Sequence, residues 1–212
     1  MSAGKELFIS SAYSSYNHVQ LVRGGHDYFD RLFQLVEEAR FTIHLQIYIF
    51  EDDETGVAVA DALMKAAKRG VQVYLLLDGY ASQHLPDDFI TELKTNGVQF
   101  RWFEPVFRSR YFYFGRRMHH KILVTDALYS LIGGVNISNR YNDMPGQKAW
   151  LDWALYSKGE VSAELYNLCV DVWNKSGWGK KKDQLLKTEA SIHSMVENAY
   201  RITLAGAFVP LA

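Results

Sequence analysis

The sequence contains little cysteine, little net charge and no long hydrophobic run. Cys169 is the single cysteine among 212 residues, so no disulfide can form within the chain, and a reducing compartment fits it best. The 23 Lys and Arg residues nearly balance the 24 Asp and Glu residues, which disfavours a generally basic nucleic-acid-binding protein but allows a local basic patch. No apolar run reaches the roughly 18 residues of a transmembrane helix, and the first residues lack a signal-peptide pattern. Any work at a membrane is therefore expected from its surface.

What the sequence does contain is the composition of one globular domain. Hydrophobic residues make up 48% of the chain, aromatic residues 14% and charged residues 22%, which excludes a disordered or collagen-like chain. The length suffices for one well-buried domain and is short for two. We expect a flexible leader over residues 1–17, one domain over residues 18–175 and a Gly- and Lys-rich linker over residues 176–190.

The hydrophobic pattern predicts alternating strands and helices. Apolar residues at helical spacing predict helices over residues 26–40, 55–69, 86–95 and 160–174. Short runs rich in β-branched and aromatic residues predict strands over residues 19–22, 41–50, 71–77, 98–103, 119–125, 128–132 and 151–156. This order predicts an α/β fold with a mixed, largely parallel sheet sandwiched between helices.

Residues 191–212 resemble the opening of a second, truncated repeat. Their VENAYRITLAGAFVP follows the order of helix and apolar strand in the earlier VEEARFTIHLQIYIF, with a gap of one residue. Two explanations stay open. The chain is a fragment of a two-repeat protein, which this pattern favours, or two identical chains pair.

The strongest motif is MHHKILVTDALYSLIGGVN, residues 118–136. Its spacing, H-x-K-x4-D-x6-G-G, arises by chance in a chain of this length at a frequency on the order of one in ten thousand. The residues that define it are His119, Lys121, Asp126, Gly133, Gly134 and Asn136.

The spacing of this motif favours phosphate chemistry. On a strand, His119 and Lys121 point to one face and His120 points away. An ammonium group can neutralise the oxygens of a phosphodiester while a neutral imidazole nitrogen attacks phosphorus. Asp126 has the other parity, which favours a structural or supporting role. Gly133 and Gly134 let a neighbouring backbone approach closely, and Asn136 is placed to donate an amide N–H to the same phosphate.

These residues resemble the phospholipase D superfamily, whose mark is this His-Lys-Asp motif, and most of all the bacterial cardiolipin synthases. The resemblance covers roughly residues 18–175 and includes the segments YIFEDDETG, GVQVYLLLDG and WLDWAL. It implies that His119 is a covalent nucleophile forming a phosphohistidine and that Asp152 is the carboxylate that orients its imidazole. The catalytic set it implies is His119, Lys121, Asp126, Asn136 and Asp152. Neither a metal ion nor another cofactor is implied.

Two departures from the family pattern stand out. Gln46 lies where relatives often have Glu, so this strand can orient the site differently. More seriously, one motif is present, whereas a two-histidine mechanism needs a general acid besides the nucleophile. No other His in the sequence has Lys two residues later. We therefore expect a second motif from a missing C-terminal half or from a homodimer partner.

A basic and aromatic segment precedes the motif, over residues 101–121. It contains six basic residues and one acid, Glu104. One interpretation is an interfacial loop that binds anionic lipid head groups. In this interpretation Arg116 and Arg117 bind the substrate together with the motif glycines Gly133 and Gly134. The other is a loop packed on the core whose arginines form surface ion pairs. The same mixture can stack nucleic acid, so it does not separate the two substrates.

The sequence thus predicts phosphatidyl transfer of the cardiolipin synthase type. The expected substrate is an anionic phospholipid such as phosphatidylglycerol, met at the membrane surface on the cytoplasmic side of the cell by a peripheral protein. Two alternatives remain. One is a single-motif nuclease acting as a homodimer, and the other is an inactive half that binds lipid or a partner.

Overall fold

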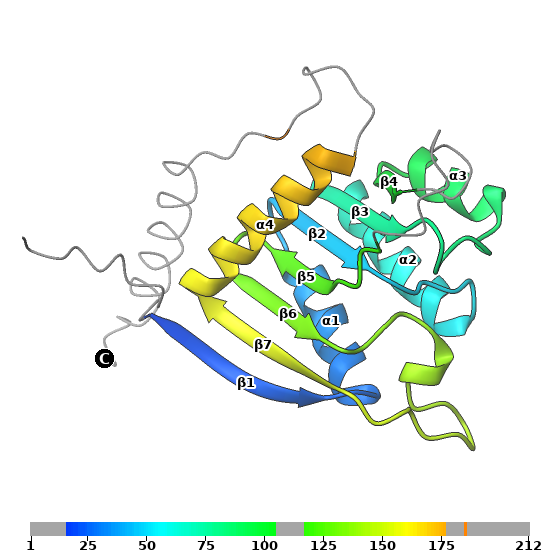
Figure 1. Ribbon diagram of the computed structural model, residues 1–212, viewed down its shortest axis with the longest axis horizontal. Helices are drawn as coiled ribbons and strands as arrows, with labels where there is room; N and C mark the ends of the chain where they lie inside the picture. The colour runs from blue at the N-terminus through cyan, green and yellow to red at the C-terminus, as the bar shows by residue number, and fades with distance from the viewer. Residues whose placement is uncertain (1–15, 105–116, 177–184, 186–212) are drawn as a thin grey trace, which may run out of the picture.

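The computed structural model describes residues 16–104, 117–176 and 185, which form an α/β domain (Figure 1). Every strand and helix expected within these residues is present, with bounds that differ by a few residues. The strands are β1 (Asn17–Arg23), β2 (Thr42–Ile47), β3 (Gln72–Asp78), β4 (Gln99–Phe103), β5 (Lys121–Thr125), β6 (Tyr129–Gly133) and β7 (Trp153–Gly159). The helices are α1 (His26–Glu38), α2 (Glu54–Lys68), α3 (Asp87–Thr95) and α4 (Glu160–Ser176), with a short 3-10 helix, η1 (Asn139–Tyr141).

The described strands form one mixed sheet in the order β1-β7-β6-β5-β2-β3-β4. Two pairings, β2 with β3 and β3 with β4, are parallel, and the other four are antiparallel. The α/β class is confirmed, but the expectation of a largely parallel sheet is wrong. The connections explain the difference. Helices α2 and α3 return the chain between parallel strands, whereas β5 and β6 are joined by a tight turn, which suits antiparallel strands.

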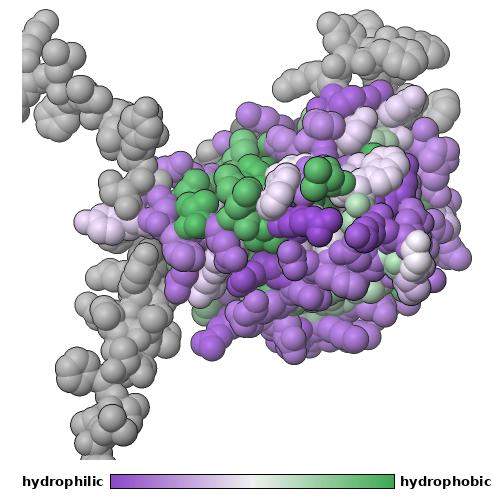
Figure 2. Space-filling model, turned by 90° about the horizontal axis from the view of Figure 1, so that it is seen from below, coloured by the Kyte–Doolittle hydropathy of each residue, from purple (hydrophilic) through white to green (hydrophobic). Residues whose placement is uncertain are grey.

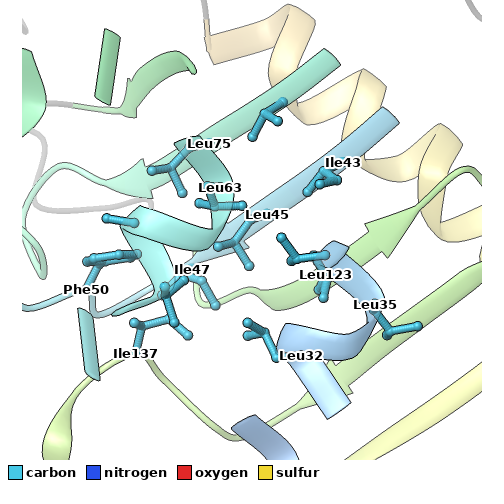
Figure 3. Close-up of a cluster of buried hydrophobic side chains, with 14 of the residues drawn as sticks. Leu32, Leu35, Ile43, Leu45, Ile47, Phe50, Leu63, Leu75, Leu123 and Ile137 are labelled. Carbon is cyan, nitrogen blue, oxygen red and sulfur yellow. The ribbon is translucent and has the colours of Figure 1, made fainter. Parts of the chain in front are cut away.

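Helices cover both faces of the sheet. Figure 1 shows α4 across the near face, with α1 and α2 behind the sheet. The alternation along β2 follows from this arrangement, because Ile43, Leu45 and Ile47 enter the large core while Gln46 and His44 face α4. Figure 3 shows the large core, in which strand side chains pack against leucines of α1 and α2.

Helix α4 leaves part of its face of the sheet open. Val19 and Leu21 of β1 are 51% and 58% exposed, and Leu155, the register partner of Leu21 on β7, is 42% exposed. Figure 2 shows apolar side chains gathered on this side of the molecule. An apolar strip over the two outer strands is therefore exposed to solvent in this chain.

One edge of the sheet brings several strand ends together. Ile47, the last residue of β2, pairs with Leu77 of β3 on one side and with Lys121, the first residue of β5, on the other. Gly133, the last residue of β6, pairs with Ala154 near the start of β7. Ligand sites of α/β folds form at the carboxyl ends of parallel strands, so this edge is the place to expect one.

The expected segments around the domain stay predictions. Most of the leader (residues 1–17), most of the linker (176–190) and all of the second repeat (191–212) lie outside the described residues. Leu185, within the linker, exchanges two backbone hydrogen bonds with the Asn174 side chain and packs against the cluster around Trp173.

Candidate active site

His119 and Lys121 lie side by side at this edge, as their spacing predicts. Lys121 Nζ is 3.1 Å from His119 Nε2 and donates to the His119 carbonyl oxygen at 3.3 Å. The Lys121 side chain is buried, while His119 is exposed at the surface. A lysine ammonium can only donate, so His119 Nε2 is the accepting nitrogen and carries no proton of its own. The pair therefore presents a nucleophilic nitrogen beside a fixed positive charge.

Tyr48, which sequence reasoning missed, is a third member of this cluster. Its ring lies 4.6 Å from the His119 ring, and Lys121 Nζ lies 5.0 Å from the centre of the Tyr48 ring. A cation over an aromatic face is stabilised by the ring quadrupole. Burial lowers the pKa of Lys121, and the negative charge of Asp152 partly opposes this effect. The signal in the sequence was an aromatic residue just after a buried strand.

Asp78 holds the segment that leads into the motif, and it too was missed. Its carboxylate is fully buried at the end of β3. One oxygen accepts from the backbone N–H groups of Tyr80 and Ala81, both at 3.0 Å, and the other accepts from Met118 N at 2.8 Å. Because Met118 directly precedes His119, Asp78 fixes the backbone next to His119. An aspartate ending an apolar strand was the available signal.

Asn136 and Ser82 hold the chain around Tyr48. Asn136 Oδ1 accepts from Ile49 N at 3.0 Å. Ser82 Oγ accepts from Phe50 N at 3.0 Å and donates to the Tyr48 carbonyl oxygen at 2.9 Å. Asn136 thus lies next to the segment that carries Tyr48, and its side-chain carbonyl holds the backbone of that segment. Its amide N–H groups, for which the described structure shows no acceptor, remain suited to a phosphate oxygen.

Gly133 is required by a close backbone approach, and Gly134 by the close approach of a side chain. A Cβ on Gly134 would overlap the Asp152 carboxylate, and a Cβ on Gly133 would overlap the Trp153 carbonyl oxygen. Asp152 Oδ1 accepts from Trp153 N at 2.8 Å. No hydrogen bond joins Asp152 to His119 in the described structure, so an orienting role for Asp152 stays a prediction. In the structure the Asp152 carboxylate lies against Gly134. Burial lowers the pKa of Lys121, and the negative charge of Asp152 acts to raise it.

Asp126 lies away from this cluster, at the opposite end of β5. Its carboxylate accepts three backbone N–H groups of the α1–β2 connection, from Arg40 at 2.9 Å, Phe41 at 2.8 Å and Thr42 at 2.9 Å. Its φ of 54° places it in the left-handed conformation used by tight hairpin turns. Its inclusion among the catalytic residues is therefore corrected, and the structural role that its parity favoured is the one its contacts describe.

Of the two arginines predicted to bind substrate, Arg117 lies within the described residues and Arg116 does not. Arg116 and residues 105–115 lie outside the described residues. The guanidinium of Arg117 lies 4.6 Å from the Tyr80 ring, next to the segment fixed by Asp78. Arg117 is therefore near the cluster, and its contact with a substrate stays a prediction.

The rim of the edge is aromatic and apolar. Trp150 is 54% exposed and Leu151 is 75% exposed, directly before Asp152. Arg140 pairs with Glu51 and lies 5.3 Å from the Trp150 ring. Large apolar side chains therefore stand at the surface beside the charged cluster.

Neither a metal-binding cluster nor a membrane-spanning helix is found among the described residues. They contain no group of three or more His, Cys, Asp or Glu side chains arranged to hold a metal ion. Among the helices they form, none is long and apolar enough to cross a bilayer.

Comparison with known proteins identifies the family. The family described as "Cardiolipin synthase, PLD-like domain" matches residues 32–151, which include the whole motif. The chain belongs to the phospholipase D-like family. It is 38% identical to cardiolipin synthase B of Escherichia coli (strain K12) over 152 residues, which are 70% of this chain and 37% of that protein.

Solved structures agree with the fold of this phospholipase D-like domain. Nuc from Salmonella typhimurium, a phospholipase D family member, matches with a TM-score of 0.58 and 17% identity, over 76% of this chain and 97% of that chain. The phosphatidylserine synthase of Haemophilus influenzae matches with a TM-score of 0.62 and 17% identity, over 89% of this chain and 44% of that chain. This chain spans just over a third of the length of cardiolipin synthase B.

Proposed function

We propose that this phospholipase D-like domain supplies one half of a phosphatidyl-transfer site. The observation that carries the proposal is the 3.1 Å contact between the buried Lys121 ammonium and Nε2 of the exposed His119. An unprotonated imidazole nitrogen at the surface, beside a fixed cation, is what attack on a phosphodiester requires. Homology to cardiolipin synthases supports a phospholipid as the diester.

The reaction proceeds in two displacements. His119 Nε2 attacks phosphorus of an anionic phospholipid such as phosphatidylglycerol, and the bond from phosphorus to the head-group oxygen breaks. That oxygen takes a proton and leaves as an alcohol. An acceptor alcohol then attacks the phosphohistidine, loses its proton and restores the free imidazole. Lys121 and the Asn136 amide stabilise the charge on the non-bridging oxygens in both steps.

The proton for the leaving group comes from a second motif. The sequence contains one His-x-Lys pair, so the chain by itself lacks a matching general acid. Either a C-terminal half of a longer protein or a second copy of this chain provides it. We place the reaction at the membrane surface on the cytoplasmic side, where the exposed Trp150 and Leu151 suit contact with a bilayer.

The test is formation of the covalent intermediate. The full chain is incubated with phosphatidylglycerol vesicles, with single-stranded DNA or with neither, and the His119 peptide is analysed by mass spectrometry. A phosphatidyl adduct on His119, absent from His119→Asn, supports the proposal. An adduct or cleavage with DNA alone supports a nuclease instead. Vesicle binding without any adduct, when a second motif is supplied by an associated second chain and also by a longer form of the protein with a C-terminal half, indicates an inactive lipid-binding half.

A further inference from the structure

Gln46 and His120 link the motif to α4 through the sheet. Gln46 lies on β2 and is 1% exposed, and its Nε2 donates to the Cys169 carbonyl oxygen of α4 at 2.9 Å. Its Oε1 lies 3.0 Å from His120 Nδ1. His120 sits between the two residues of the catalytic pair, in the short segment before β5 that lacks regular strand pairing. The link therefore ties an irregular segment of the motif to a buried part of the fold.

These two contacts determine which nitrogen of His120 carries a proton. The Cys169 carbonyl oxygen can only accept, so the Gln46 atom facing it is the amide nitrogen. The other Gln46 atom is then the carbonyl oxygen, which also only accepts. His120 Nδ1 must therefore be the donor, and in the neutral ring Nε2 has no proton.

The surroundings of His120 favour the neutral ring. Burial lowers the pKa of His120, and the charges of Lys121 and His119 lower it further. A protonated His120 would add a second positive charge beside Lys121. The spacing on a strand predicts only that His120 points away from His119 and Lys121, and the structure adds that its partner is a buried amide.

We propose that Gln46 fixes a ring proton of His120 on Nδ1, and that His120 held in this way is a positioning residue for the His119–Lys121 pair. The proposal rests on the proposed function for its effect on catalysis. In structural terms, the hydrogen bond between Gln46 and His120 fixes the segment before β5, so that the side chains of His119 and Lys121 lie against each other. An ionised carboxylate at position 46 has no proton to donate to the Cys169 carbonyl and stabilises charged His120.

The tautomer is tested first, by NMR of the full chain with ¹⁵N-labelled histidine. We expect the His120 signals of a neutral ring with the proton on Nδ1. In Gln46→Met, which has similar volume but no acceptor, this preference is expected to disappear. His84→Gln, at an exposed histidine of the β3–α3 loop, is the matched control and leaves the His120 signals unchanged. A proton on Nε2 in the unaltered chain, or an unchanged tautomer in Gln46→Met, would overturn the proposal.

The positioning role is tested by the rate of adduct formation on His119. His120→Ala is expected to slow it by about 10–100-fold, since small misplacements of reacting groups have effects of this order, with the lipid concentration at half-maximal rate unchanged. His120→Asn keeps an N–H directed at Gln46 and is expected to recover most of the rate, which also covers the case in which Gln46→Met does not fold. Equal rates for the Ala and Asn variants contradict the positioning role. If no His119 adduct forms even when the second motif is supplied, while the Nδ1–H tautomer is found, the proposed function fails and the Gln46–His120 link stands.

Discussion

The two ends of β5 carry residues of one sequence motif but have different physical roles. At its first residue, Lys121 lies against His119, and both face an exposed edge of the sheet. At the other end, Asp126 accepts three backbone N–H groups and contacts no member of that cluster. The strand between them spans about 13 Å at the usual rise per residue. A fixed spacing in sequence therefore does not mean a single site in space.

The distant end still matters to the site, because it fixes register. Asp126 N donates to the Thr42 carbonyl at 2.9 Å while its carboxylate holds the same connection, so the start of β2 and the end of β5 are fixed together. That register pairs Ile47 with Lys121. A slip of one residue would turn Lys121 to the other face of the sheet. One end of β5 thus carries the residues of the proposed chemistry, and the other end fixes their position.

The largest effect is expected for substitution of His119, which should lower the rate of the proposed reaction but leave the free energy of unfolding nearly unchanged. His119→Asn is expected to lower the rate of phosphatidyl transfer by at least about 10³-fold, which is about 4 kcal/mol in activation free energy, because it removes the nucleophile. Its ring is exposed, so the free energy of unfolding should change by less than about 0.5 kcal/mol. Transfer assays and urea denaturation of the same preparation measure both. Equal turnover in the two proteins would remove His119 from the mechanism.

The converse is expected at the other end of β5. Asp126→Ala leaves three backbone donors without their acceptor and should lower the free energy of unfolding by about 3 kcal/mol. Asp126→Asn keeps one carbonyl oxygen and is expected to lose about half as much. Denaturant unfolding measures both. Activity per folded molecule should be nearly unchanged in Asp126→Asn, and a loss as large as that of His119→Asn would restore Asp126 to the catalytic set.

Local patterns predicted most of this fold because the spacing of hydrophobic residues over a few positions distinguishes a strand from a helix. The run FTIHLQIYIF gave β2, and the parity of His119 and Lys121 gave their common face. The largely parallel prediction is wrong because β1 pairs with β7 and β2 pairs with β5, and such pairings between segments distant in the sequence are not encoded by any local pattern. The error turned a mixed sheet with four antiparallel pairings into a largely parallel one.

The part of the site that sequence reasoning missed is held by long-range contacts. Asp78, Tyr48 and Ser82 reach the motif only after β2 and β3 pair with their neighbours. The signals in their own segments, such as an aspartate that ends an apolar strand, are shared by many ordinary turn and strand-end residues. Motif membership, by contrast, placed Asp126 in the site although its partners belong to the α1–β2 connection.

An intermediate effect, on the pH dependence of stability, is expected from His44 of β2, which pairs with β5 between its two ends. His44 pairs with Val124 of β5, is fully buried and has no hydrogen-bond partner for either ring nitrogen in the described structure. Burial lowers its pKa from 6.5 to about 3. The unfolded chain binds a proton near pH 6.5 and the folded chain does not until about pH 3, so stability is constant above that window and falls as pH decreases through it. The loss at pH 5 should be about 2 kcal/mol.

His44→Phe tests this titration. The variant keeps an aromatic ring against Tyr74, whose ring stacks on His44 at 4.6 Å, but cannot bind a proton. Urea denaturation at pH 5 and pH 7.5 is expected to show about 2 kcal/mol less pH dependence in the variant than in the original chain. His84→Gln, at an exposed histidine, should retain the original dependence. Parallel pH profiles for His44→Phe and the original chain would assign the acid sensitivity to other groups.

The smallest expected effect sharpens the description of the His119 end. Arg117 lies over the Tyr80 ring at 4.6 Å, a cation–π contact worth about 0.5–1 kcal/mol at exposed sites. Arg117→Ala should lower the free energy of unfolding by no more than that, and should weaken binding to anionic vesicles about fivefold, since one basic residue near such a surface contributes about 1 kcal/mol. Lys68→Ala removes the same charge from the last turn of α2, at the opposite end of the sheet, and should leave vesicle binding unchanged. Sedimentation with phosphatidylglycerol vesicles at low and high salt measures the difference, which salt should reduce. If both variants bind alike, the two ends of the domain do not differ toward lipid, and Arg117 serves only to hold Tyr80.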